Sequence, residues 1–80
     1  MSNSSVFEAS GVVVENLPNT IFRVKITQAQ QAEVVDKLVL CTLSGKMRIN
    51  WVRLLPGDKV KCDVSTIDPT KGRITYKIKP

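Results

Sequence analysis

The segment Ser44–Trp51 gathers two cations, an amide and a large aromatic ring, and reads Ser44-Gly45-Lys46-Met47-Arg48-Ile49-Asn50-Trp51. Lysine and arginine bind phosphate oxygens, and several of them on one surface release the counterions condensed on a nucleic acid. Further cations follow this segment at Arg53, Lys71 and Arg73. These residue types at this spacing predict binding of an anionic partner rather than catalysis.

The basic side chains are concentrated in the second half of the chain. The whole sequence has 12 Lys and Arg against 7 Asp and Glu, a net charge of +5 over 80 residues. Residues 1–40 hold three bases against four acids, whereas residues 41–80 hold nine against three. An anionic partner is therefore expected to contact surface built by the second half. Lysines on strand faces also protect sheet edges from aggregation. For the strand lysines alone, this structural explanation is as good as binding of an anionic partner.

Residues that usually carry catalysis are missing or isolated. The chain has no histidine, and its two cysteines, Cys41 and Cys62, do not form a Cys-x-x-Cys pair. We therefore predict neither a metal site nor a disulfide framework, and interpret both cysteines as core residues. Gly45-Lys46 lacks the rest of a phosphate-binding loop, and no pair of carboxylates suits acid–base work. We expect no enzyme activity, no cofactor and no metal.

Nothing in the sequence indicates a membrane partner. Its longest apolar run, Leu38–Cys41, is far too short to cross a bilayer. Residues 1–5 are polar and are expected to form a flexible tail, without the basic and apolar regions of a secretory signal. We therefore expect a soluble protein of a reduced intracellular compartment.

Five segments have the composition of β-strands and are separated by turn residues. In the later strands apolar and polar residues alternate, which predicts that Val60, Cys62 and Val64 point inward and that Tyr76 does the same. Gly11 interrupts the first strand and predicts a bulge or a bend. The predicted strands are residues 6–17, 21–27, 37–43, 59–65 and 73–79.

Two linking segments have helical rather than strand character. Residues 28–36 are rich in Gln, Ala and Glu, and are expected to form either one turn of helix or a mobile, extended loop between strands two and three. Residues 46–54 have the apolar spacing of one short helical turn. A five-stranded oligonucleotide-binding (OB-fold) barrel has its extra helix between strands three and four, so we predict an all-β OB-fold domain over residues 6–80. An SH3-like barrel is the alternative.

The aromatic side chains are interpreted mainly as core. Phe22 and Tyr76 fall on the inward side of their predicted strands, and Trp51 is assigned to the core at roughly two to one over stacking. The sheet would then lack the aromatic ladder that binds single strands regardless of sequence. Contacts to the backbone and grooves of a folded RNA are the better fit. The sequence also predicts no exposed apolar patch.

Several segments together resemble bacterial-type translation initiation factor one. Their order and approximate spacing fit that family from Gly11 to Tyr76, and four short motifs in register are far more specific than any one of them. Relative to the family, residues 28–36 are an insertion. The matching pieces are Leu17-Pro18-Asn19-Thr20 with Phe22-Arg23-Val24, Ser44-Gly45-Lys46-Met47-Arg48 with Asn50 and Arg53, Gly57-Asp58-Lys59-Val60, and Lys71-Gly72-Arg73-Ile74.

The resemblance implies an OB-fold protein that docks at the aminoacyl-tRNA site of the small ribosomal subunit. It implies contacts to 16S rRNA and a neighbouring small-subunit protein, and joint action with the other two bacterial initiation factors to direct initiator tRNA to the peptidyl site. A monomer is expected, and the resemblance implies a location in the bacterial cytoplasm or in an organelle of bacterial descent. By their positions in the matching motifs, the implied rRNA-binding residues are Lys46, Arg48, Arg53, Lys71, Arg73 and Asn19.

Two other functions remain open on the sequence. A general single-stranded RNA chaperone of the cold-shock type would use the same barrel but would stack bases on Trp51. A structural or protein-interaction barrel would bind its partner without dependence on salt.

Overall fold

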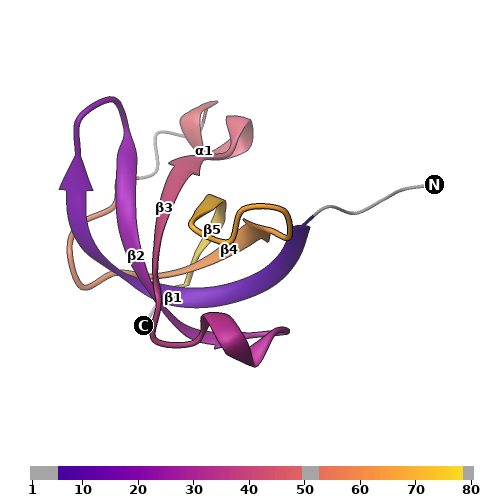
Figure 1. The fold of residues 1–80 in the computed structure, drawn as a ribbon. Coiled ribbons are helices and arrows are strands. Elements are labelled where there is room, and N and C mark those ends of the chain that lie inside the picture. The colour runs from indigo at the N-terminus through magenta and orange to yellow at the C-terminus, as the bar shows by residue number, and fades with distance from the viewer. Residues whose placement is uncertain (1–5, 50–52, 79–80) are drawn as a thin grey trace.

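The computed structural model describes residues 6–49 and 53–78 (Figure 1). Its strands form a closed barrel in the order β1-β2-β3-β5-β4. Neighbouring strands are antiparallel except β3 and β5, which are parallel. The elements are β1 (Val6–Leu17), β2 (Ile21–Ala29), the 3-10 helix η1 (Ala32–Val34), β3 (Leu38–Leu43), α1 (Gly45–Ile49), β4 (Lys59–Ser65) and β5 (Lys71–Ile78).

The predicted fold class is confirmed. The structure is all-β, its five strands close into a barrel, and the short helix α1 lies between β3 and β4, as in an OB-fold. The predicted bounds of the first and fourth strands match β1 and β4. The predicted tail at residues 1–5 lies outside the described residues.

Part of the segment 28–36, predicted as a turn of helix or a mobile loop, belongs to the sheet. Gln28 and Ala29 continue β2, because Gln28 pairs with Ser10 of β1 and Ala29 pairs with Ala9. The chain then turns through η1, whose Val34 is buried in the core. Figure 1 shows η1 at the end of the barrel opposite α1.

Strand β1 pairs with two strands, and irregularities in its pairing allow it to curve from one to the other. It pairs with β2 along one edge and with β4 along the other. The β1–β2 register shifts between Ser10 and Gly11, where the sequence predicted a bulge or bend. Gly11 is needed there because a Cβ on it would collide with the backbone carbonyl of Lys25.

The barrel interior is filled by inward-facing residues of all five strands. Val13, Val24, Val39, Val60 and Ile74 contribute one fully buried side chain from each strand. None of the described buried side chains is polar or charged. Burial of the core is therefore the main source of stability.

Both cysteines belong to this core, as predicted. Cys41 and Cys62 have free thiols and are fully buried. A hydrogen bond with the Cys62 thiol, together with burial, raises the pKa of the Cys41 thiol well above its ordinary value. Cys41 is therefore held as a neutral thiol rather than as a reactive thiolate.

Strand β5 departs from the alternation that its sequence predicts. Ile74 pairs with Cys62 and Tyr76 pairs with Lys61, which leaves Thr75 as an extra residue in a β-bulge. Cys62 faces the core and Lys61 faces solvent, so Ile74 is buried while Tyr76 is exposed. The prediction that Tyr76 is a core residue is wrong for this reason.

Candidate nucleic-acid interface

The turn that carries Asn19 and the helix α1 lie at the same end of the barrel (Figure 1). Asn19 has φ 65° and Thr20 has φ 58°, a left-handed conformation that asparagine tolerates better than most residues. Directly after this turn, Phe22 of β2 pairs with Cys41 near the end of β3, which leads into α1. The register thus brings the predicted site residue Asn19 towards the helix.

Helix α1 is anchored by the buried side chain of Met47. The amide of Met47 donates to the hydroxyl oxygen of Ser44 at 3.3 Å and to its carbonyl oxygen at 3.1 Å, and Met47 packs into the core. The predicted site residues Lys46 and Arg48 are the neighbours of Met47 on this helix. The structure does not describe the side chains of Lys46 and Arg48, and it does not describe Asn50 or Trp51. The prediction that Trp51 is buried therefore falls outside the described residues.

Arg53 is exposed and stands on a tightly held segment of backbone. Its carbonyl oxygen accepts a hydrogen bond from Lys77 Nζ at 3.1 Å. The next carbonyl, of the buried Leu54, accepts one from Asn16 Nδ2 at 3.3 Å. Arg53 therefore also lies at the end of the barrel that carries the β1–β2 turn, because Asn16 is in the last residues of β1.

Lys77 is held by hydrogen bonding and charge against the neighbouring loop. After the bulge at Thr75, Lys77 pairs with Val60, whose side chain is buried. Besides its bond to the Arg53 carbonyl, its ammonium lies 3.5 Å from the carboxylate of Asp58. Lys77 is thus used to fix the 53–58 loop and is not free for an external anion.

Lys71 and Arg73 line one groove on the outside of the barrel. Both side chains are exposed, and among the described residues neither is within 4 Å of a carboxylate oxygen. The groove has a volume of about 320 Å³ and mixes cationic, hydroxyl and carboxylate groups. Its lining residues are Val6, Thr42, Asp63, Ser65, Lys71, Gly72 and Arg73.

The groove reaches α1 through the parallel pairing of β3 with β5. Arg73 is opposite Thr42, and the carbonyl oxygen of Ile74 accepts a hydrogen bond from the amide of Ser44, immediately before α1. Lys71 is opposite Leu40, further from the helix. The structure therefore brings Arg73 beside the α1 segment and extends the cationic surface along β5 to Lys71.

An ordered turn presents Lys71 to the groove. The amide of Lys71 donates to the carbonyl oxygen of Asp68, while Thr70 donates its hydroxyl and its amide to the Asp68 carboxylate. The bonds from Thr70, with a smaller contribution from the charge of Lys71, hold the pKa of Asp68 below its ordinary value. Asp68 is therefore ionised at neutral pH, next to the cation that it helps to position.

The sequence missed two features of this surface. Thr42 and Ser65 supply hydroxyl groups to the groove, which the search for charged motifs does not find. Leu38 and Leu40 alternate with the buried Val39 and are 54% and 40% exposed, so β3 places two apolar side chains at the surface that the sequence does not single out. Period-2 alternation within the apolar run of β3 is the signal that would have found them.

Other kinds of site are not evident in the described part of the chain. Within residues 6–49 and 53–78, no three His, Cys, Asp or Glu side chains come close enough to hold a metal ion. No helix there is both long and apolar enough to span a membrane. The arrangement suits contacts to phosphates and to hydrogen-bonding edges of a nucleic acid.

The fold and the motifs agree with comparisons with known proteins. The family model for translation initiation factor 1A / IF-1 matches residues 3–80. The solution structure of translation initiation factor IF-1 from the Wolbachia endosymbiont strain TRS of Brugia malayi is similar, with a TM-score of 0.68 and 32% identity over 95% of this chain and 82% of that one. YjeQ from Thermotoga maritima shares the fold alone, with a TM-score of 0.66 and 22% identity over 90% of this chain and 23% of that one. The chain therefore belongs to the translation initiation factor 1A / IF-1 family.

Proposed function

We propose that this protein binds 16S rRNA at the aminoacyl-tRNA site of the small ribosomal subunit, beside a neighbouring small-subunit protein. It occupies that site and acts with the other two initiation factors to direct initiator tRNA to the peptidyl site. It acts as a monomer in the bacterial cytoplasm and performs no catalysis.

Family membership supplies the general part of this function, which is translation initiation through RNA binding and association with the ribosome. The single observation that carries the specific part is the groove along β5. Lys71 and Arg73 line it, with Arg73 reaching the α1 segment through the β3–β5 pairing. Two exposed cations on one rigid strand hold a fixed spacing, which suits successive phosphates of a folded RNA.

The mechanism is occupation of a site. Phosphate contacts from Lys71, Arg73 and Arg53 position the barrel, and the α1 segment with Lys46 and Arg48 enters the RNA groove. The Asn19 turn, at the same end of the barrel, contacts a neighbouring part of the RNA (Figure 1). Blocking the site then requires only that the rigid barrel fills the volume of the excluded tRNA.

Co-sedimentation with purified 30S subunits tests this proposal. We expect Arg73→Asp to weaken 30S binding by about 1–3 kcal/mol, and Lys71→Gln to lower the slope of log affinity against log salt by about one. Lys37→Gln is the matched control, because Lys37 is an exposed lysine beside η1 and outside the proposed interface. Undiminished 30S affinity of the Arg73 variant at moderate salt, with the wild-type fold retained, would contradict the proposal.

A further inference from the structure

The bulge in β5 exposes the one tyrosine of the sequence. Tyr76 is 57% exposed, and the ammonium group of Lys61 on β4 lies 6.0 Å from the centre of its ring. The phenol ring is thus available at the surface with a cation beside it. An exposed ring next to a cation is the pair of groups that holds an unpaired nucleotide, since the base stacks on the ring and the cation meets a phosphate.

Tyr76 is one member of a row that crosses four strands. The strand registers place Tyr76 beside Lys61, Lys61 beside Ser10, and Ser10 beside Gln28. An aromatic ring, an ammonium group, a hydroxyl and an amide therefore follow one another across the outside of the barrel. Adjacent strands in a sheet lie roughly 4.8 Å apart, so this row spans about the length of two nucleotides.

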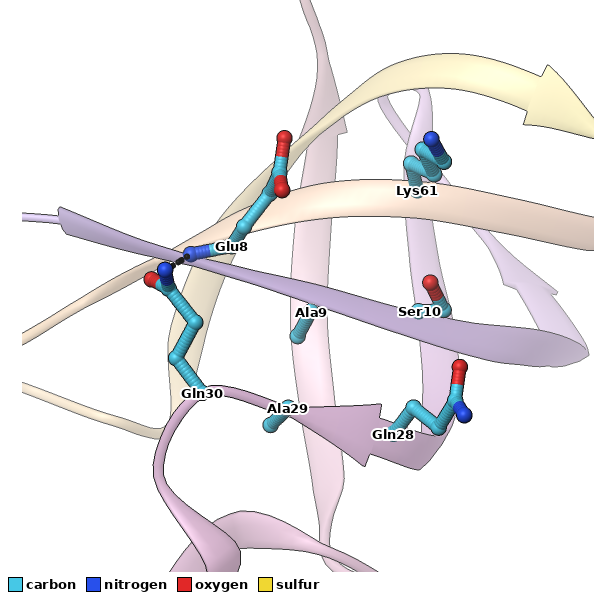
Figure 2. Close-up of a pocket in the computed structure, with 7 residues that line it drawn as sticks. All are labelled: Glu8, Ala9, Ser10, Gln28, Ala29, Gln30 and Lys61. Atoms are coloured by element: carbon cyan, nitrogen blue, oxygen red, sulfur yellow. Dashed lines mark hydrogen bonds between the residues drawn. The ribbon is translucent and has the colours of Figure 1, made fainter.

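A shallow pocket lies at the far end of this row. It has a volume of about 300 Å³ and contains Ser10, Gln28 and Lys61 of the row together with Glu8, Ala9, Ala29 and Gln30 (Figure 2). Gln30 is held in place because its Oε1 accepts a hydrogen bond from the amide of Glu8 at 3.0 Å. The Gln28 amide, the Ser10 hydroxyl and the Glu8 carboxylate offer donors and acceptors of the kind that read the edge of a base.

The neighbouring row adds positive charge. Lys25, Val12, Lys59 and Ile78 lie side by side on β2, β1, β4 and β5. Lys25 and Lys59 are exposed, and among the described residues neither is ion-paired. With Lys61 they make three cations around the tyrosine and the pocket, against the carboxylate of Glu8 at the pocket and that of Asp63 in the next row. The balance on this face favours a polyanion.

We propose that the outer face of β2, β1, β4 and β5 is a second RNA-binding surface, which takes one or two unpaired nucleotides. One base stacks on Tyr76, the linking phosphate meets Lys61, and the next base enters the pocket beside Gln28. This surface is distinct from the groove of Lys71 and Arg73, although both use β5. The inference does not depend on binding at the aminoacyl-tRNA site.

Fluorescence anisotropy of a labelled eight-nucleotide pyrimidine RNA tests the proposal, with the same RNA annealed to its complement as the comparison. Stacking on an aromatic ring is worth about 1–3 kcal/mol per base, so we expect Tyr76→Leu to weaken binding of the single strand by roughly 5- to 150-fold. Tyr76→Phe keeps the ring and should stay within about twofold of wild type. Tyr76→Leu should leave duplex binding unchanged, because paired bases are not free to stack on the ring and the duplex can bind only through its phosphates.

Lys37→Gln is again the charge control and should leave binding of the single strand within about twofold. The inference is overturned if Tyr76→Leu binds the single strand as wild type does, if Phe fails to replace Tyr, or if Tyr76→Leu weakens duplex binding as much as single-strand binding. Co-sedimentation of Arg73→Asp with 30S subunits separates the two surfaces. If Arg73→Asp loses 30S binding but still binds the oligonucleotide, and adding Tyr76→Leu weakens that binding, the two surfaces are independent. If Tyr76→Leu does not weaken oligonucleotide binding in the Arg73→Asp protein, the second surface is refuted and the first is unaffected.

Discussion

Gly72 lies against the backbone of Asp63 so closely that a Cβ on Gly72 would be 2.7 Å from the Asp63 carbonyl oxygen. The same Cβ would come within 3.4 Å of Val39 and 3.5 Å of the Cys41 sulfur. Gly72 separates Lys71 from Arg73, and its close approach therefore sets how deeply the two cations sit against β4. Gly72 therefore affects both the packing of β5 on β4 and the positions of the two cations in the groove.

Substitution of Gly72 by alanine should destabilise the protein. The nearest obstacle is backbone, which cannot rotate away, so β4 and β5 must separate, and we expect a loss of about 1–3 kcal/mol in the free energy of unfolding. Gly45→Ala is the matched control because nothing lies within 4 Å of the position that its Cβ would take, and it begins α1, where alanine is the better helix former. Urea unfolding of both variants checks this, and equal stability would contradict it.

Removal of the Lys77 ammonium should loosen the 53–58 loop. Lys77→Met keeps most of the aliphatic chain but leaves the Arg53 carbonyl without its donor and Asp58 without its cation. We expect a loss of about 0.5–1.5 kcal/mol in stability, together with faster amide exchange of Leu55, which donates to Asp58. Lys59→Met, on an exposed lysine at the start of β4, should change stability by less than about 0.5 kcal/mol.

The Asp68 carboxyl should titrate with a pKa below its ordinary range, because hydrogen bonds from Thr70 favour its ionised form. A pKa that is lower in the folded state than in the unfolded state stabilises the fold above the unfolded pKa. That contribution is lost as the pH falls through the folded pKa. Carbon-13 NMR of the carboxyl group measures the midpoint. Thr70→Val should move it back towards the ordinary value, and an unshifted midpoint in wild type would refute the interpretation.

Neither thiol should react with a soluble disulfide reagent while the barrel is closed. Cys41 and Cys62 are both fully buried, so modification requires opening of the core. The rate should therefore rise with urea in proportion to the unfolded population. Val39→Ala, which removes a fully buried side chain of the same core, should raise the rate at fixed urea, whereas Leu40→Ala on the exposed face should not. Rapid labelling of native protein would contradict the prediction.

The parts of the fold that were predictable from sequence are those set by local rules. Strand β4 alternates cleanly between buried and exposed residues, and Gly11 marks a bulge whatever strand lies beside it. The left-handed conformation of Asn19 is likewise set locally, by the Pro18-Asn19 dipeptide itself. The OB-fold assignment followed because the helical segment falls after the third strand.

The errors come from the register in which one strand pairs with the next, which the sequence of a single strand does not reveal. Thr75 has no feature that marks it as a bulge, and only the register of β5 on β4 exposes Tyr76 and brings Lys77 against the 53–58 loop. The added length of β2 has the same origin, because Gln28 is a strand residue only through its pairing with Ser10. In the candidate site, charged motifs found Lys71 and Arg73, but their shared groove depends on β3 and β4 supplying the other wall.

The position of β5 between β3 and β4 has a kinetic consequence. The β1–β2 hairpin joins neighbours in the chain and can form within microseconds, whereas pairing of β1 with β4 and of β3 with β5 joins segments far apart in sequence. Such closure puts refolding in a regime of roughly milliseconds to seconds. The groove of Arg73 needs β3 beside β5, and the row of Tyr76 needs β1 beside β4, so RNA affinity should appear only when these distant pairings form. A stopped-flow binding signal should therefore trail the formation of the first hairpin.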